Sequence, residues 1–193
     1  GSGGTPLQAS GSASTKPGTF VDLNLALTRV GKPTIAMVNG HALAGGLGLV
    51  VACDVAICAD DALFGTTEIA VGLWPMMITA EITRSVGRKK TLDMMLTGRK
   101  LDAQEALACG LVTRVVPADR LVAETRALAE AIAEKSPAAI ALGLHAFYRS
   151  QDMELAPALH YLQGELGRVL ALEDAAEGIA AFLGKRKPVW KGK

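Results

Sequence analysis

Apolar residues recur along the chain in two patterns, one typical of helices and the other of buried strands. Helical spacing over 20–30 predicts a helix that Gly31 ends. Short apolar runs at 34–38 and 54–59 predict two buried strands, and the fully apolar stretch 47–53 between them predicts a short buried helix. An Asn-Gly pair follows the first strand and an Asp-Asp pair follows the second, so each strand is expected to end in a turn.

The rest of the chain is predicted to be mostly helical. Asp102-Ala-Gln-Glu105 is typical of a capping box that begins a helix, and the run L-V-T-R-V-V before Pro117 predicts one more strand. The predicted helices cover residues 78–86, 88–97, 102–110, 119–135, 137–149, 153–172 and 174–183, and a short extended piece is predicted at 63–65.

This order of elements predicts an α/β (α+β) chain in three parts. Residues 1–19 are rich in glycine, serine and threonine, lack the charge and apolar regions of a signal peptide, and predict a flexible arm. Residues 20–117 contain the predicted strands and glycine turns, and residues 118–193 are a run of helices. A chain of 193 residues is long enough for one domain with a substantial core.

Composition narrows the classes of function. Half of the residues are hydrophobic but only 4% are aromatic, so alanine, leucine, valine and isoleucine must build most of the core. A formal net charge of +1 creates no overall field, and we expect neither nucleic acid nor a membrane as a partner. Three cysteines without C-x-x-C spacing, and three histidines without ligand spacing, predict no disulfide framework, no metal site and a cytoplasmic location.

The stretch HALAGGLGLVVACD at 41–54 places Gly45, Gly46 and Gly48 directly before an apolar run. Neither the G-x-G-x-x-G pattern of dinucleotide sites nor the G-K-[ST] of a P-loop is present. Backbone N–H groups at a helix start are unpaired, and glycine lets a ligand oxygen approach them, as in an oxyanion hole. Close packing of the helix on the sheet is the alternative interpretation.

A second candidate is Glu68, which lies in the apolar stretch F-G-T-T-E-I-A-V-G. Its neighbours Phe64, Ile69 and Val71 would partly desolvate the carboxylate and raise its pKa toward a value that suits proton transfer. A solvated surface glutamate is the alternative. The basic C-terminus F-L-G-K-R-K-P-V-W-K-G-K similarly has two interpretations, a solvated tail or a phosphate contact.

Four segments together resemble the crotonase superfamily, the enoyl-CoA hydratase/isomerase group, over roughly Val30 to Trp190. The resemblance implies a stacked β-β-α spiral core with an acyl-CoA site, followed by a helical region that forms a homotrimer or a dimer of trimers. A CoA thioester is the implied ligand, without a metal or redox cofactor. In family order the segments are KPTIAMVNGHALAGGLGL, ACDVAICADDALFGTTEIAVGL, LTGRKLDAQEALACGLVTRVV and EGIAAFLGKRKPVW.

The resemblance also assigns roles to individual residues. Gly45 would supply a backbone N–H to the thioester oxyanion, and Glu68 would match the glutamate that acts as acid and base. The residues implied in substrate binding are Ala42 and Leu43 along the acyl-CoA path, Gly46 where the helix begins close to the ligand, and Phe182 and Lys185, which would reach the CoA of a neighbouring subunit.

The chain departs from the family pattern in three places. Gly48 occupies the position of a second glutamate in hydratases of the family, Met76 and Met77 replace part of a glycine-rich segment, and the upstream strands and second oxyanion donor have no counterpart in 1–19. Two carboxylates hold and split the attacking water in a hydratase, whereas one suffices to move a proton from the α to the γ carbon. We therefore expect double-bond isomerisation through a thioester enolate. A non-catalytic acyl-CoA-binding or assembly module is the alternative.

Overall fold

The computed structural model describes residues 18–193, so nearly all of the predicted N-terminal arm lies outside the described part. The first helix, α1 (Phe20–Arg29), begins where the apolar spacing predicts. Thr19 forms a capping box at its start, since its hydroxyl accepts the Asp22 N–H at 3.2 Å and the Asp22 carboxylate accepts the Thr19 N–H at 2.8 Å. Two of the four unpaired groups of this helix end are thereby satisfied.

Within residues 18–193, six short strands form two three-stranded sheets. The first sheet has the order β1-β3-β6 and is parallel, and the second has the order β2-β4-β5, in which β5 runs antiparallel to β4. The predicted strands are confirmed as β1, β3 and β6, and the short extended piece is β4. The bounds are β1 Ile35–Val38, β2 Ala42–Leu43, β3 Val55–Ala59, β4 Leu63–Gly65, β5 Lys100–Asp102 and β6 Arg114–Val116.

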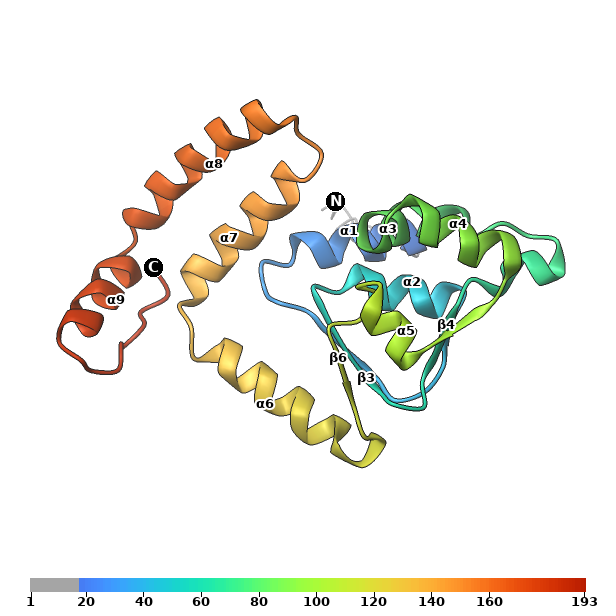
Figure 1. Ribbon diagram of the computed structural model, residues 1–193. Helices are drawn as coiled ribbons and strands as arrows, with labels where there is room; N and C mark the ends of the chain where they lie inside the picture. Colours follow the sequence, from blue (N-terminus) through green and yellow to red (C-terminus); the bar gives the residue numbers. More distant parts are fainter. Residues whose placement is uncertain (1–17) are drawn as a thin grey trace, which may run out of the picture.

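The fully apolar helix α2 (Gly45–Ala52) lies at the centre of the core and begins two residues earlier than predicted. It packs against α3 (Met76–Val86), α1, β1 and β2, which explains why no face of it is polar. Helix α4 (Arg88–Thr97) packs on α3 and on the turn that follows β4, and α5 (Ala103–Ala108) packs on β4 and β5 of the second sheet (Figure 1). Leu47, Phe64 and Ile82 are fully buried in this cluster.

The chain then leaves the core along α6 (Leu121–Ala133), which packs on β1 and β3. Two 3₁₀ turns join the elements, η1 (Thr67–Val71) after β4 and η2 (Ala118–Arg120) before α6. None of the helices in the described residues is long and apolar enough to cross a membrane.

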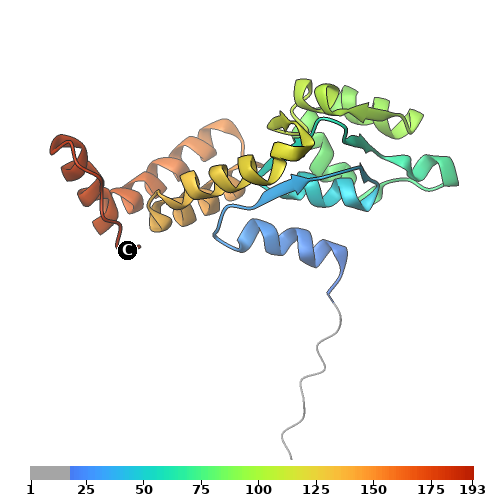
Figure 2. The ribbon, with the colours of Figure 1, turned by 90° about the horizontal axis from the view of Figure 1, so that it is seen from below.

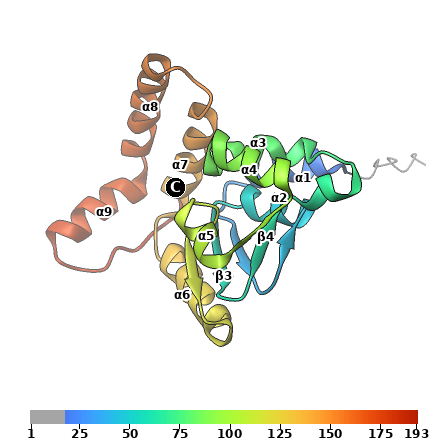
Figure 3. The ribbon, with the colours of Figure 1, turned by 45° about the vertical axis from the view of Figure 1, so that its right-hand side comes forward.

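The last three helices form a separate layer that projects from the core in all three views (Figures 1, 2 and 3). We call α7 (Pro137–Ser150), α8 (Leu155–Leu170) and α9 (Glu173–Leu183) the C-terminal helical region. Its helices pack on one another, and α7 also contacts α1 of the core. The Tyr148 hydroxyl on α7 donates to Asp54, whose other carboxylate oxygen accepts from Thr34. This polar chain ties the helical region to the first sheet.

Candidate active site

Two parallel strands bring the predicted acid/base and the predicted oxyanion donor together. In the register of β2 and β4, Ala42 lies beside Phe64 and Leu43 beside Gly65. Gly45 follows β2 by two residues and Glu68 follows β4 by three. The carboxyl ends of parallel strands meet at one edge of a sheet, so both residues leave at the same edge. Gly45 and Glu68 accordingly line one cavity of about 440 Å³.

The backbone that leads into α2 is strained. Ala44 has φ of 50° and ψ of −126°, a conformation that residues with a Cβ rarely adopt and that costs about 1–3 kcal/mol. Hydrogen bonds hold it in place, because its N–H donates to the Gly65 carbonyl at 2.9 Å and its carbonyl accepts the Gly48 N–H at 3.2 Å. The peptide before Gly45 is therefore fixed from both sides.

The three glycines of α2 have different surroundings. A Cβ at Gly45 or Gly46 would meet no atom within 4 Å, so close packing does not explain these two. A Cβ at Gly48 would lie 2.4 Å from Ile78 Cγ2 and 2.8 Å from Phe20 Cζ, which is too close for any side chain. Packing is thus the reason for Gly48, whereas open space adjoins the N-terminal N–H groups at Gly45 and Gly46, which have no acceptor within the helix.

Glu68 lies in the 3₁₀ turn η1 and is half-buried. One carboxylate oxygen, Oε2, is buried and has no hydrogen-bond partner among the described residues, so its capacity to accept a hydrogen bond is unused. The apolar neighbours expected from the sequence are not the ones that line the cavity. Ile69 and Val71 of the turn are exposed, and Phe64 of β4 is buried in the core, so none of the three lines Glu68's cavity.

The apolar wall of the cavity comes instead from α1 and from the segment that leads into α3. Phe20, the first residue of α1, was not predicted to belong to the site, since only tertiary packing over Gly48 brings it there. Met76 and Met77, noted in the sequence as departures from the family pattern, are wall residues. The full lining is Phe20, Gly45, Glu68, Leu73, Trp74, Pro75, Met76, Met77 and Ile78.

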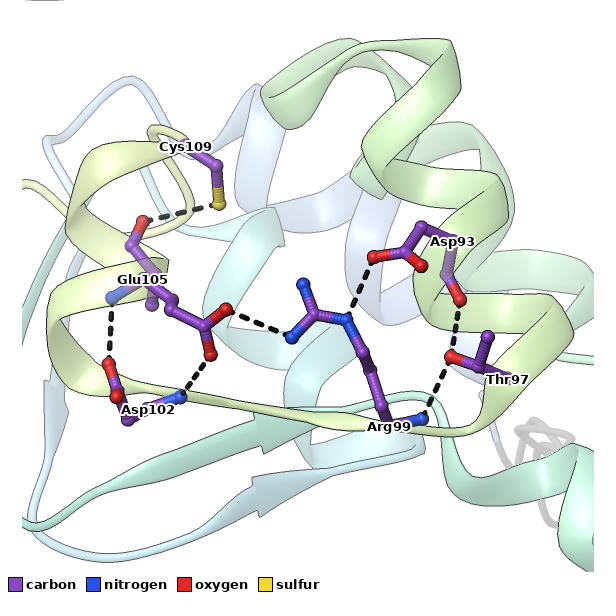
Figure 4. Close-up of polar contacts among 7 residues, drawn as sticks. Asp93, Thr97, Arg99, Asp102, Glu105 and Cys109 are labelled. Carbon is purple, nitrogen blue, oxygen red and sulfur yellow. Dashed lines mark hydrogen bonds and ion pairs between the residues drawn. The ribbon is translucent and has the colours of Figure 1, made fainter.

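An ion-pair network supports the strand beside β4 (Figure 4). The Arg99 guanidinium donates to Asp93 at 2.8 Å and to Glu105 at 2.9 Å, and so joins α4 to α5 just before β5. Arg99 holds the pKa of the Glu105 carboxyl below its usual range, and the Asp102 N–H adds to this effect. Next to Arg99, Gly98 has φ of 64°, and a Cβ there would lie 2.9 Å from Ile69 Cγ2. Gly98, the residue before Arg99, therefore packs against η1, the turn that carries Glu68.

The other predicted binding residues are distributed over two places. Ala42 is buried and Leu43 half-buried in β2, directly before the strained turn, and Gly46 is exposed at the start of α2. Phe182 and Lys185 are exposed at the end of α9, at the opposite end of the molecule from β4 and η1 in Figures 1 and 3. They do not line the Glu68 cavity of their own chain. All three cysteines are free.

The fold matches solved structures of the crotonase type. A Mycobacterium smegmatis enoyl-CoA hydratase aligns with a TM-score of 0.86 and 37% sequence identity, covering 89% of this chain and 66% of that one. Human enoyl-CoA hydratase domain-containing protein 3 aligns with a TM-score of 0.86 and 40% identity, covering 89% of this chain and 68% of that one. The chain thus has the crotonase fold over the part that aligns.

The sequence identifies the family. Residues 6–193 match the family model of the enoyl-CoA hydratase/isomerase proteins, and the chain belongs to that family. A probable enoyl-CoA hydratase of Mycobacterium bovis is 45% identical over 163 residues, 84% of this chain and 63% of that protein. The mouse mitochondrial enoyl-CoA hydratase domain-containing protein 3 is 42% identical over 158 residues, 82% of this chain and 53% of that protein. The chain therefore spans between half and two thirds of the length of these relatives.

Proposed function

We propose that this chain binds an enoyl-CoA thioester and moves its double bond through an enolate, with Glu68 as the acid/base. The observation that carries the proposal is the shared cavity of Glu68 and Gly45. A free carboxylate oxygen and the unpaired N–H groups of a helix start are the two groups that enolate chemistry requires.

The proposed reaction has two proton transfers. Glu68 takes a proton from the α carbon of a 3-enoyl thioester, and the electron pair delocalises onto the thioester oxygen, where the Gly45 N–H stabilises the negative charge. The protonated Glu68 then returns the proton to the γ carbon, and the double bond is left between the α and β carbons. The same carboxyl group acts as base and then as acid, so no second group is needed.

Isomerisation is favoured over hydration because the space that a second carboxylate would need is filled. Among the described residues that line the cavity, Glu68 carries the one carboxylate. Phe20 and Ile78 occupy the place where a side chain at position 48 would begin. Two apolar side chains there offer no hydrogen bond to a water molecule, which a hydratase must hold and split.

The test compares both substrate isomers. We expect the protein to convert 3-enoyl-CoA into 2-enoyl-CoA and to form little 3-hydroxyacyl-CoA. Glu68→Gln should lower the rate of isomerisation about 10²–10⁴-fold while leaving acyl-CoA affinity within about twofold. Glu134→Gln, the same change at an exposed position after α6, is the control and should keep the parent rate.

Three outcomes would contradict the proposal in different ways. A Glu68→Gln protein as fast as the parent would remove the acid/base assignment. Rapid formation of 3-hydroxyacyl-CoA would replace isomerisation by hydration. Tight acyl-CoA binding without turnover of either isomer would favour the binding or assembly module instead.

We also propose that the C-terminal helical region assembles the chain into a trimer. Leu155, Leu159, Leu162, Leu166 and Leu170 form an exposed apolar stripe at helical spacing on α8. In such an assembly Phe182 and Lys185 would reach the CoA of a neighbouring subunit, since they do not line the cavity of their own chain.

Light scattering tests the assembly, and a monomer at all concentrations would contradict it. Lys185→Ala should weaken binding of a CoA thioester about tenfold, because a charge-assisted hydrogen bond is lost. Lys89→Ala, on the exposed face of α4, is the matched control and should bind as the parent does.

A further inference from the structure

The turn η1, which carries Glu68, is held only in part by its own residues. Thr66, the residue before the turn, is fully buried, and its hydroxyl makes no capping bond and has no hydrogen-bond partner among the described residues. The Gly72 N–H donates to the Ile69 carbonyl at 3.1 Å, and the Leu73 N–H donates to the Glu68 carbonyl at 3.0 Å. These bonds tie the turn to itself, so the place of Glu68 beyond the end of β4 depends on what packs against η1.

The bend at 97–99, between α4 and β5, packs against this turn. Gly98 has φ of 64°, a conformation that favours glycine. A Cβ at this position would lie 2.9 Å from Ile69 Cγ2 and 3.9 Å from the Thr66 carbonyl oxygen. Helix α4 packs on η1 as well. The bend therefore approaches the turn so closely that a side chain at position 98 would displace it.

The same bend meets the other half of the site. Gly65 ends β4, which pairs with β5 in antiparallel register. A Cβ at Gly65 would lie 3.3 Å from the Arg99 carbonyl oxygen, so the two backbones are in close contact here. The Gly65 carbonyl accepts the Ala44 N–H and thereby fixes the peptide that leads to Gly45. Residues 97–99 thus contact both η1 and the strand end that supports the proposed oxyanion donor.

The Arg99 side chain fixes this bend from outside the Glu68 cavity (Figure 4). Its guanidinium is shared between Asp93 of α4 at 2.8 Å and Glu105 of α5 at 2.9 Å. Its backbone N–H donates to the Thr97 hydroxyl at 3.2 Å, and this hydroxyl donates to the Asp93 carbonyl. A planar guanidinium shared between two carboxylates is held in one direction, because both bonds are charge-assisted. The three charged side chains are half-buried, and none of them lines the cavity.

We propose that Arg99 is a positioning residue that fixes Glu68 relative to the Gly45 N–H. It acts through the bend at 97–99 and touches neither the substrate nor the reacting atoms. The inference rests on the proposed function, because it takes Glu68 and Gly45 to be the groups that transfer the proton and stabilise the oxyanion. A displacement of about 1 Å can lower a rate about 10²-fold, so a small movement of η1 is enough to change turnover.

Turnover and ligand affinity, measured side by side, test this role. Arg99→Gln removes both charge-assisted bonds and should lower kcat for isomerisation of 3-enoyl-CoA about 10–10²-fold. The affinity for an unreactive saturated acyl-CoA, measured by isothermal titration, should stay within about twofold. Arg99→Lys keeps the charge without the fork and should recover part of the lost rate.

Two further variants keep the test independent of how well Arg99→Gln folds. Glu105→Gln breaks one of the two bonds and leaves a residue that can still cap α5, so its kcat should lie between those of the parent and Arg99→Gln. Arg120→Gln breaks the exposed pair with Glu124 at the start of α6. It is the matched control and should keep the parent rate.

A double-mutant cycle separates positioning from a general loss of structure. In a Glu68→Gln background no acid/base remains to be positioned, so Arg99→Gln should lower the residual rate by less than about threefold. A general loss of folded protein would lower the rate by the same factor in both backgrounds.

Amide hydrogen exchange measures the turn itself, without turnover. The Gly72 and Leu73 N–H groups report on η1 because both donate to carbonyls within it. Arg99→Gln should speed their exchange at least about tenfold and leave the amides of β3 unchanged.

The outcomes separate this inference from the proposed function. An Arg99→Gln protein with the parent kcat, or one that loses acyl-CoA affinity as much as rate, would overturn the positioning role. An equal loss in the Glu68→Gln background would overturn it too. A parent protein that turns over neither isomer would overturn the proposed reaction. Exchange at Gly72 and Leu73 would then decide the inference, since faster exchange would keep Arg99 as the residue that holds η1 and unchanged exchange would overturn that as well.

Discussion

The core and the C-terminal helical region differ in what covers their apolar side chains. In the core, Leu47, Phe64 and Ile57 are fully buried, and the helices and sheets cover one another. In α7–α9 many of the larger apolar side chains face outward, and Phe182 is 83% exposed. The core can be stabilised by its own hydrophobic burial, whereas the helical region must rely on other contacts within one chain.

Polar contacts stabilise the C-terminal helical region. Asp174 is buried and accepts hydrogen bonds from the Ser136 hydroxyl at 2.6 Å and from the Lys191 N–H at 2.7 Å. Arg186 donates to both oxygens of Glu177, and the Trp190 indole N–H donates to the Glu134 carbonyl at 2.7 Å. We call these contacts the tail clasp. Directional hydrogen bonds and an ion pair therefore hold the last residues against α7 and α9.

The largest expected effect on the free energy of unfolding comes from comparing a Phe→Ala substitution in the core with one in the C-terminal helical region. Phe64→Ala should lower the free energy of unfolding by about 3–5 kcal/mol, because it opens a cavity in the core. Phe182→Ala should change it by less than about 0.5 kcal/mol in the monomeric chain, since the side chain is already in water. Denaturant unfolding at low protein concentration measures both. Equal losses would mean that the two regions are not stabilised differently.

A second pair of substitutions compares two glycines within the core helix α2. Gly48→Ala should destabilise the chain by about 1–3 kcal/mol, because its Cβ overlaps Ile78 and Phe20. Gly46→Ala adds a Cβ in open space and should cost less than about 0.5 kcal/mol. Thermal unfolding of the two variants checks the order, and a more stable Gly48→Ala protein would contradict the packing described for Phe20.

A third change breaks the tail clasp without touching the core. Asp174→Ala removes the acceptor for the Ser136 hydroxyl and for the Lys191 and Gly192 N–H groups, so these two amides should exchange with solvent at least about tenfold faster. Amides of β3 should be unchanged. Asp119→Ala, the same change at an exposed position of η2, is the control. Unchanged exchange at Lys191 in the Asp174 variant would show that something else holds the tail.

The smallest effect is a dependence of the tail clasp on pH. Arg186 lowers the pKa of Glu177 to about 2, with help from the Val189 N–H, and the Ser136 hydroxyl lowers the pKa of Asp174. A carboxylate with a lowered pKa stabilises the fold above its ordinary pKa, and this contribution is lost as the pH falls toward the folded value. The clasp should therefore loosen between about pH 4.5 and pH 2.

Tryptophan fluorescence follows this change. The chain has two tryptophans, and in a Trp74→Phe variant the signal reports on Trp190 alone. Glu177→Gln should loosen the tail already at neutral pH and flatten the acid transition. A Trp190 signal that stays constant down to pH 2 would contradict the stabilising part assigned to these carboxylates.

The sequence predicts the longer elements well and the shortest ones poorly. The helices of the second half are confirmed because apolar periodicity over ten or more residues is a strong signal. β2, β5 and η1 were not predicted, since two to five residues are too few for a period and tertiary pairing decides their form. α2 begins at Gly45 although glycine is a poor helix former, because the burial of Leu47, Val50 and Ala52 in the core outweighs propensity.

The candidate site was predictable in part. Gly45 and Glu68 follow from ordered sequence segments, and the parallel register of β2 and β4 explains why they share a cavity. The position of Phe20 in the site could not be predicted from the sequence, since it depends on the absence of a side chain at Gly48, 28 positions later. The strain at Ala44 could not be predicted either, because alanine rarely adopts a positive φ and its presence does not indicate one.

That strained turn has a consequence for the reaction proposed above. Ala44 is fixed through its N–H and its carbonyl before any ligand arrives, so the direction of the adjacent Gly45 N–H is decided during folding. In water, dipoles must reorient as charge develops on an oxygen, and that reorientation is part of the activation barrier. At a preorganised amide the free-energy cost of orientation lowers the stability of the fold and does not add to the activation barrier of the reaction. A chain relaxed here by Ala44→Gly would thus be expected to fold more stably and to turn over more slowly.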